Sequence, residues 1–154
     1  MSLETLIEIS LSELDIFLKH NDWFGRENEV VNLYCHRFLL GSNTDTKVTP
    51  GQCGIEVAVK QLPGEKSKKV VRKDLVIWEH DNQTVWSADQ KPINSPLAII
   101  EWKVNSVMNC NYDIDWLTRY TEAYPSVLGY SVCAHIKKNR SVQFKKIKGG
   151  KVIT

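Results

Sequence analysis

The sequence lacks several features by which classes of protein are recognised. No apolar run approaches the roughly 18 residues that a membrane-spanning helix needs, so we expect no membrane partner. The opening MSLETLIEIS is acidic and has neither the basic start nor the small-residue cleavage site of a signal peptide, which predicts a cytoplasmic protein. Neither a phosphate loop of the Walker type nor a nucleophile elbow around a serine or cysteine is present, so hydrolases of those kinds are not indicated.

The few cysteines and histidines do not have the spacing of a ligand set. The four cysteines, Cys35, Cys53, Cys110 and Cys133, form no CxxC pair. We therefore expect neither a structural zinc site nor a disulfide framework, and we predict reduced thiols. The chain has 154 residues, of which 42% are hydrophobic and 25% charged, as in an ordinary globular protein. This length predicts a single domain over residues 1–154.

The net charge of +2 conceals an uneven distribution of acids and bases. Residues 1–45 hold eight acids and three bases, whereas residues 123–154 hold seven bases and no acid. An anionic partner such as a nucleic-acid backbone would suit the basic segment. A solvated basic edge that discourages aggregation of a sheet also explains it, and charge alone favours this second explanation.

Hydrophobic periodicity predicts three helices and five strands. The helices are expected over 2–19, with Ser2 as a candidate cap, 26–40 and 112–124. The strands are expected over 55–62, 69–78, 96–104, 126–138 and 141–148. This order predicts an α/β fold whose central mixed sheet has the early helices on one face and the later helix on the other. We expect an accessory N-terminal helix within residues 1–22 and a core over residues 23–154.

The strand expected over 96–104 carries two opposite charges within an apolar run. Glu101 and Lys103 are two residues apart and therefore share one face, while Trp102 points to the other. A lone buried carboxylate is costly, and a buried ion pair often barely recovers its desolvation cost. A divalent cation would explain the acid, because Mg²⁺ prefers oxygen ligands and takes one or two carboxylates.

A second carboxylate, Asp74, lies in the strand expected over 69–78. If the two strands pair as antiparallel neighbours, Asp74 and Glu101 can share one Mg²⁺ or Mn²⁺ ion. Lys103 would then position the attacking water. The acid-x-lysine spacing recurs twice in polar loops, without an apolar strand around it, and we interpret both matches as chance: Asp45–Lys47 and Asp89–Lys91.

Glu27 lies in the middle of the apolar stripe of the helix expected over 26–40. At 100° per residue, Val30 and Tyr34 fall within about 60° of Glu27, whereas Glu29 falls about 160° away. The helix dipole favours an acid at this end of the helix but does not explain why it is on the apolar face. We expect Glu27 to face the sheet, near the two other acids.

The segments RENEVVNLY, KDLVIW and LAIIEWK, on a helix and two later strands, resemble the PD-(D/E)xK nuclease superfamily. They are similar in particular to archaeal Holliday junction resolvases and other restriction-endonuclease-like domains. The resemblance implies a restriction-endonuclease-like fold and an Mg²⁺-dependent endonuclease that hydrolyses phosphodiester bonds in DNA. It also implies that Asp74, Glu101 and the backbone carbonyl of Trp102 bind the metal, that Lys103 is catalytic, and that Glu27 supports the metal or its water shell.

The match covers residues 25–135 and departs from the family pattern at two points. Lys73 replaces the proline that precedes the aspartate. In the helix expected over 112–124, Asp113, Asp115 or Arg119 stands where many relatives have a glutamine or lysine facing the site.

Several basic residues are candidates for contacts with a nucleic acid. They are Lys69, Arg72, Lys73, Lys137, Lys138 and Arg140. The first three surround the approach to Asp74, where they would bind phosphates or simply solvate a hairpin. Trp86, in a polar stretch between strands, is a candidate for stacking on a base. Cleavage of two strands would favour a homodimer, and residues 1–22 would either form its surface or pack on the domain.

Two other interpretations stay open. The chain could keep the nuclease fold as a non-catalytic nucleic-acid-binding or assembly module, although it retains the full set of two acids and a lysine. Glu101 and Lys103 could instead form a structural ion pair, in which case loss of Lys103 would destabilise the fold. The nuclease interpretation predicts that removal of Glu101 leaves the metal-free protein equally or more stable, because it removes one of two repelling acids.

Overall fold

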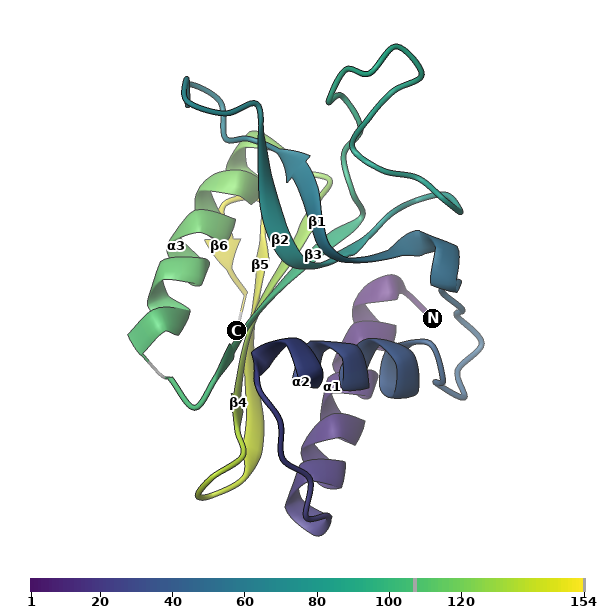
Figure 1. Cartoon of the computed structure of the whole chain (residues 1–154), viewed down its shortest axis with the longest axis vertical. Helices are drawn as coiled ribbons and strands as arrows, with labels where there is room; N and C mark the ends of the chain where they lie inside the picture. Colours follow the sequence, from purple (N-terminus) through teal and green to yellow (C-terminus); the bar gives the residue numbers. More distant parts are fainter. Residues whose placement is uncertain (107, 154) are drawn as a thin grey trace.

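The fold is built on one mixed sheet of six strands (Figure 1). The computed structural model describes residues 1–106 and 108–153. Its strands are β1 (Cys53–Lys60), β2 (Val70–Ile77), β3 (Ala98–Val104), β4 (Leu128–His135), β5 (Ser141–Lys148) and β6 (Lys151–Val152). They lie in the order β1-β2-β3-β4-β5-β6, and every neighbouring pair is antiparallel except β3 and β4. This arrangement confirms the predicted central mixed sheet.

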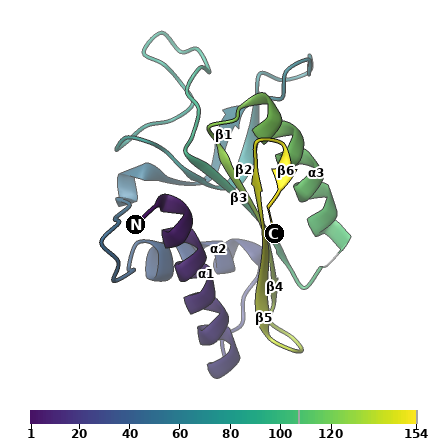
Figure 2. The ribbon, with the colours of Figure 1, turned by 180° about the vertical axis from the view of Figure 1, so that it is seen from behind.

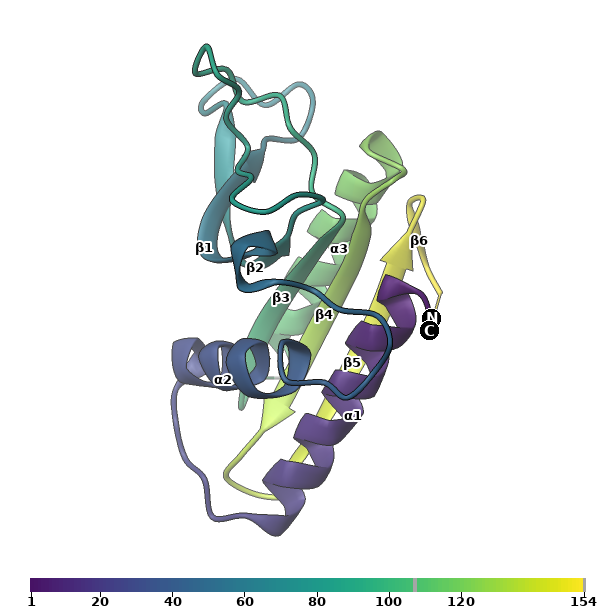
Figure 3. The ribbon, with the colours of Figure 1, turned by 90° about the vertical axis from the view of Figure 1, so that its right-hand side faces the viewer.

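Helices cover both faces of the sheet, as Figures 2 and 3 show. They are α1 (Leu3–His20), α2 (Glu27–Leu33), its π-helical continuation η1 (Tyr34–Leu39), the short 3-10 helix η2 (Pro50–Gln52) and α3 (Met108–Ala123). The α1, α2 and η1 segments pack on one face, and α3 packs on the other, where it connects the parallel strands β3 and β4. Parallel neighbours need such a crossover, so the position of α3 follows from the topology. The predicted distribution of helices is confirmed.

The N-terminal helix packs on the domain through an apolar stripe. Its buried side chains, at most 1% exposed, are Leu6, Ile7, Leu11, Leu14 and Leu18, besides the polar Ser10. Ser2 caps the helix as expected, since its hydroxyl oxygen accepts a hydrogen bond from the Thr5 N–H. Of the two places expected for this segment, the structure shows the one against the core.

Acids of α1 face lysines of β5 and account for part of the uneven charge distribution. Lys146 Nζ lies 2.8 Å from a carboxylate oxygen of Glu8, and Lys148 Nζ lies 2.9 Å from one of Glu4. Ion pairs that remain partly open to solvent, as these do, contribute little stability individually. They nevertheless show that acids of the N-terminal segment neutralise part of the basic C-terminal segment, which had suggested an anionic partner.

The prediction that all four thiols are reduced is wrong for two of them. A disulfide joins Cys110 in the first turn of α3 to Cys133 in β4, with their Cα atoms 6.6 Å apart. The two residues are separated by 23 positions, without any cysteine motif. Their proximity arises only because α3 crosses the sheet between β3 and β4. Cys35 and Cys53 are free thiols.

Within residues 1–106 and 108–153, no helix is both long and apolar enough to cross a membrane.

Candidate functional site

The candidate site lies where the side-chain alternation of β1 and β2 reverses. Leu75 belongs to the core beneath α1 and α2, whereas Lys73, two residues earlier, lies against Trp116 of α3. Residues two apart on a regular strand share a face, so the strand changes faces at Asp74. Opposite Asp74 in β1 is Glu56, an exposed non-glycine residue with a φ of 55°. Left-handed backbone at such a residue is strained, and strain of this kind gathers at functional sites.

The carboxylates of Asp74 and Glu101 continue the pairing of β2 and β3 beyond their backbone ladder. The ladder ends at the pair Leu75 and Ile100. The Asp74 N–H then donates to Glu101 Oε2 at 3.0 Å, and the Trp102 N–H donates to Asp74 Oδ2 at 2.8 Å. Each acid is thus oriented by the backbone of the opposite strand. The predicted antiparallel pairing, and the approach of the two acids that it implied, are confirmed.

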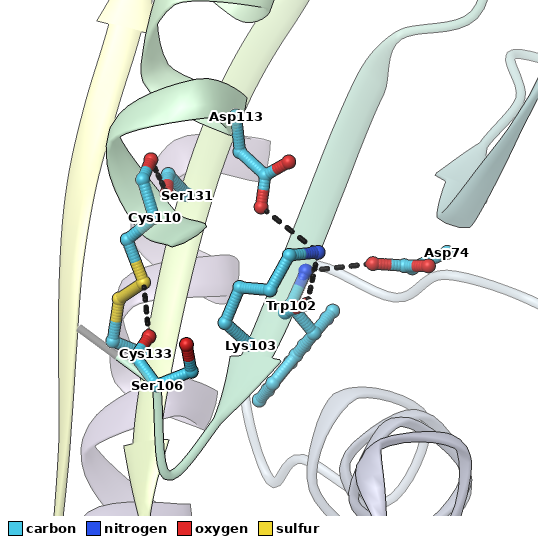
Figure 4. The surroundings of a disulfide bond; sticks show 8 residues. All are labelled: Asp74, Trp102, Lys103, Ser106, Cys110, Asp113, Ser131 and Cys133. Carbon is cyan, nitrogen blue, oxygen red and sulfur yellow. Dashed lines mark hydrogen bonds and ion pairs between the residues drawn. A yellow bond between two sulfur atoms is a disulfide. The ribbon is translucent and has the colours of Figure 1, made fainter. Parts of the chain in front are cut away.

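Lys103 lies between Asp74 and Asp113 of α3, as Figure 4 shows. Its Nζ donates to the backbone carbonyl of Trp102 at 3.0 Å and lies 3.2 Å from Asp113 Oδ2. Burial by itself lowers the pKa of Lys103, but the negative charges of Asp113, Glu27 and Asp74 outweigh it and raise the pKa above its ordinary value. Lys103 is therefore a firmly protonated cation beside the acids. The sequence left the facing residue of α3 open, and the structure places Asp113 there.

Asp74 is a partly buried acid whose pKa is strongly raised. Burial of the carboxyl is the main cause that raises its pKa, from 3.8 to about 7, and the charges of Glu101 and Glu27 act in the same direction. The Trp102 N–H and the Lys103 ammonium oppose the shift. A carboxyl with such a raised pKa favours an additional positive charge nearby.

Glu101 has a different ionic partner from the one considered in the sequence. Its Oε1 lies 2.6 Å from Lys73 Nζ, and both side chains are only 7% exposed. The ammonium group also lies 3.5 Å from the centroid of the Trp116 ring, a cation–π contact. Lys73 is therefore not the surface phosphate contact that we expected, because the change of strand face at Asp74 turns it inward beneath α3.

This pairing reverses the sign of the stability change expected at Glu101. Removal of one member of a buried ion pair leaves an uncompensated charge, which typically costs about 3–5 kcal/mol. Loss of Glu101 should thus destabilise the metal-free protein through Lys73. The structural ion pair considered in the sequence exists, but Lys73 is the partner instead of Lys103.

Glu27 faces the site from the first turn of α2. It is half-buried and lines a small pocket of about 20 Å³ together with Asp74 and Glu56. Glu29 is exposed, and its Oε1 accepts a hydrogen bond from the Arg26 N–H. The predicted difference between Glu27 and Glu29 is confirmed. Glu56, an acid within the apolar segment GIEVAVKQL, is exposed, as the alternation of that strand favours, and it also lines the pocket.

The other basic residues lie in two different settings. Lys69, Arg72, Lys137 and Lys138 are exposed. Arg140 is half-buried and donates to the carbonyls of Leu18 and Trp23 at 2.7 and 2.6 Å, with further bonds to Asn21 and Ile136. Its guanidinium therefore joins the end of α1 to the turn after β4, and its hydrogen-bonding capacity is used within the chain. Trp86 is 43% exposed, in the long segment between β2 and β3.

Within residues 1–106 and 108–153, no three His, Cys, Asp or Glu side chains lie close enough together to hold a metal ion by themselves. The oxygen donors that the site does bring together are the carboxylates of Asp74 and Glu101 and the carbonyl of Trp102. Comparison of the chain with protein-family models, curated proteins and solved structures finds no match in any of the three.

Proposed function

We propose that this protein is a metal-dependent nuclease that hydrolyses phosphodiester bonds in DNA. The observation that carries the proposal is the meeting of Asp74 and Glu101 at the point where β1 and β2 change faces, with the Lys103 ammonium beside them. The antiparallel pair β2–β3, followed by the crossover helix α3 and the parallel strand β4, supports a restriction-endonuclease-like fold. The resemblance of the three sequence segments points to the same superfamily.

The donor set fits Mg²⁺ or Mn²⁺. Two carboxylates and one backbone carbonyl are hard oxygen ligands, and Mg²⁺ commonly combines one or two protein carboxylates with water and substrate phosphate. The pKa of Asp74 is raised first by burial and then by the charges of Glu101 and Glu27, and a divalent cation nearby would stabilise its ionised form. When bound, the metal ion would polarise the scissile phosphate and lower the pKa of a water molecule.

The protein residues would have separate roles in hydrolysis. Asp74, Glu101 and the Trp102 carbonyl would hold the ion, with Glu27 supporting its water shell across the small pocket. Lys103, fixed by the Trp102 carbonyl and by Asp113, would orient the attacking water and stabilise charge that develops on the phosphate. The exposed Lys69 and Arg72, on the strand that carries Asp74, would contact neighbouring phosphates.

One observation favours a second candidate function, a non-catalytic nucleic-acid-binding or assembly module. The Lys73–Glu101 pair already satisfies Glu101 without any metal. A purely structural role for that pair nevertheless leaves Asp74 with its raised pKa and Lys103 aimed at the Trp102 carbonyl unexplained.

The test compares Lys103→Met with Lys91→Met. Both lysines follow an acid by two positions, but Lys91 lies in a loop, 71% exposed and 3.6 Å from Asp89. We expect the wild type and Lys91→Met to cleave labelled DNA in Mg²⁺ or Mn²⁺, and Lys103→Met to bind the metal but lose cleavage by at least about a hundredfold. DNA binding without cleavage by the wild type, on duplex, branched and single-stranded substrates, would favour the second function.

A further inference from the structure

Lys73 is a buried cation to which the proposed mechanism gives no role. Its side chain is 7% exposed, its Nζ is 2.6 Å from Glu101 Oε1, and it lies over Trp116. Burial of an ammonium group costs several kcal/mol unless partners compensate it. The Lys73 ammonium is therefore held in place by this carboxylate and this ring, and it has little freedom to reach a ligand at the surface.

A count of charges shows what this cation leaves unbalanced. Five acids gather at the site: Glu27, Glu56, Asp74, Glu101 and Asp113. Two lysines accompany them, and each is closest to one acid, Lys73 to Glu101 and Lys103 to Asp113. The remaining acids, Asp74, Glu27 and Glu56, all line the small pocket. These acids have no lysine partner of their own, so a divalent cation in the pocket would reduce the excess of negative charge.

Building on the proposed nuclease function, we propose that Lys73 is a built-in cation that takes the place of a second metal ion. The site would then hold a single divalent cation, with Asp74 among its ligands. Glu101 Oε1 accepts a hydrogen bond from Lys73 Nζ, whereas Glu101 Oε2 accepts one from the Asp74 N–H. Lys73 acts as a positioning residue, because it neutralises and aims Glu101 without touching the substrate.

The informative variant is Lys73→Met. Methionine is unbranched, nearly as long as lysine, and suited to contact with the Trp116 ring, so it removes the charge with little change in packing. Loss of one unit charge from a half-buried site should raise the affinity for a divalent cation by about tenfold or more. It also frees Glu101 Oε1, so that a second ion can bind. Lys91, 71% exposed in the loop between β2 and β3, provides the control Lys91→Met.

The measurement is calorimetric titration with Mn²⁺ alone, without DNA, on proteins whose folding is checked by circular dichroism. We expect the wild type and Lys91→Met to bind one ion per chain, and Lys73→Met to bind either a second ion or one ion at least tenfold more tightly. If the unpaired Glu101 prevents Lys73→Met from folding, the same titration is made with Lys73→Ala supplied with methylammonium. That added cation should restore the wild-type stoichiometry and affinity.

The failure of this inference can be told apart from the failure of the proposed function. Two ions bound by the wild type, or Lys73→Met with the same stoichiometry and an affinity within threefold of the wild type, would overturn the role of Lys73 and leave the nuclease proposal standing. No Mn²⁺ bound by the wild type at millimolar concentration would overturn both.

Discussion

Replacement of Asp74 by asparagine tests whether the folded protein raises the pKa of this carboxyl. Burial and the charge of Glu101 raise the pKa of Asp74 from 3.8 to about 7. Between pH 3.8 and pH 7 the folded chain keeps a proton on Asp74 that the unfolded chain has lost. The stability that this protonated carboxyl contributes is therefore complete below pH 3.8 and is lost as the pH rises through 7. A shift of about three units corresponds to about 4 kcal/mol. We halve this to about 2 kcal/mol, because the carboxylate is only partly buried and solvent screens it.

Asp74→Asn removes the charge and keeps an oxygen that can accept the Trp102 N–H. In EDTA at pH 8, we expect the variant to be about 2 kcal/mol more stable than the wild type, which for a chain of this size raises the melting temperature by about 6 °C. Below pH 4 the two proteins should be equal within about 0.5 kcal/mol. The assay is urea denaturation at pH 4, 6 and 8.

The control for this experiment is Asp115→Asn, because the Asp115 side chain is 76% exposed. We expect Asp115→Asn to show no pH-dependent increase in the free energy of unfolding. Mg²⁺ should stabilise the wild type at pH 8 and leave Asp74→Asn unchanged, since a ligand that binds only the folded state stabilises it by mass action. If Asp74→Asn were no more stable than the wild type at pH 8, or more stable by the same amount at every pH, the raised pKa of Asp74 would be refuted.

Two further predictions concern the scaffold around the site. Arg140→Ala removes the donors that hold the carbonyls of Leu18 and Trp23. This variant should lower the free energy of unfolding by about 2–3 kcal/mol. The control Lys138→Ala, at an exposed neighbour, should change it by less than about 0.5 kcal/mol. Equal effects of the two variants in urea denaturation would mean that Arg140 does not clamp the end of α1. Replacement of Cys110 and Cys133 by serine opens a 23-residue loop and should lower the free energy of unfolding by about 3 kcal/mol. Reductant should destabilise the wild type by the same amount and leave the double variant unaffected. A wild type whose stability does not change with reductant would contradict the disulfide.

The sheet and its helices could be predicted because their signals are local. The apolar run in 96–104 gives β3, and the periodic leucines of 2–19 give α1, in both cases within two residues of the observed bounds. The change of face at Asp74 could not be predicted in this way. KVVRKDLVIW reads as one strand, and only the left-handed backbone of Glu56 in the neighbouring strand shows where the alternation reverses.

The acids of the site were also predictable, because a carboxylate on an apolar face demands an explanation. The basic residues gave no comparable signal. Lys73 and Arg140 look like surface cations in the sequence, but their partners are 28 and up to 122 residues away. Long aliphatic side chains allow lysine and arginine either to reach solvent or to reach a buried acceptor, and the choice depends on tertiary contacts. Hydrophobic periodicity does not contain that information.

Lys73 stands where the proposed nuclease superfamily has a proline, and it would change how folding and the proposed metal binding are linked. A proline before Asp74 would supply no cation, and Glu101 would then need the metal to neutralise it. With Lys73 present, Glu101 is neutralised and oriented in the metal-free chain, while Asp74 is left with a raised pKa. Metal-dependent stabilisation should therefore act through Asp74 far more than through Glu101. In thermal unfolding with increasing Mg²⁺, we expect the double variant Lys73→Met/Glu101→Gln, in which both buried charges are removed together, to keep part of the stabilisation that Asp74→Asn loses completely. If the double variant lost it completely and Asp74→Asn kept it, Glu101 would be the main metal ligand, and Lys73 would be displaced by the metal instead of remaining beside it.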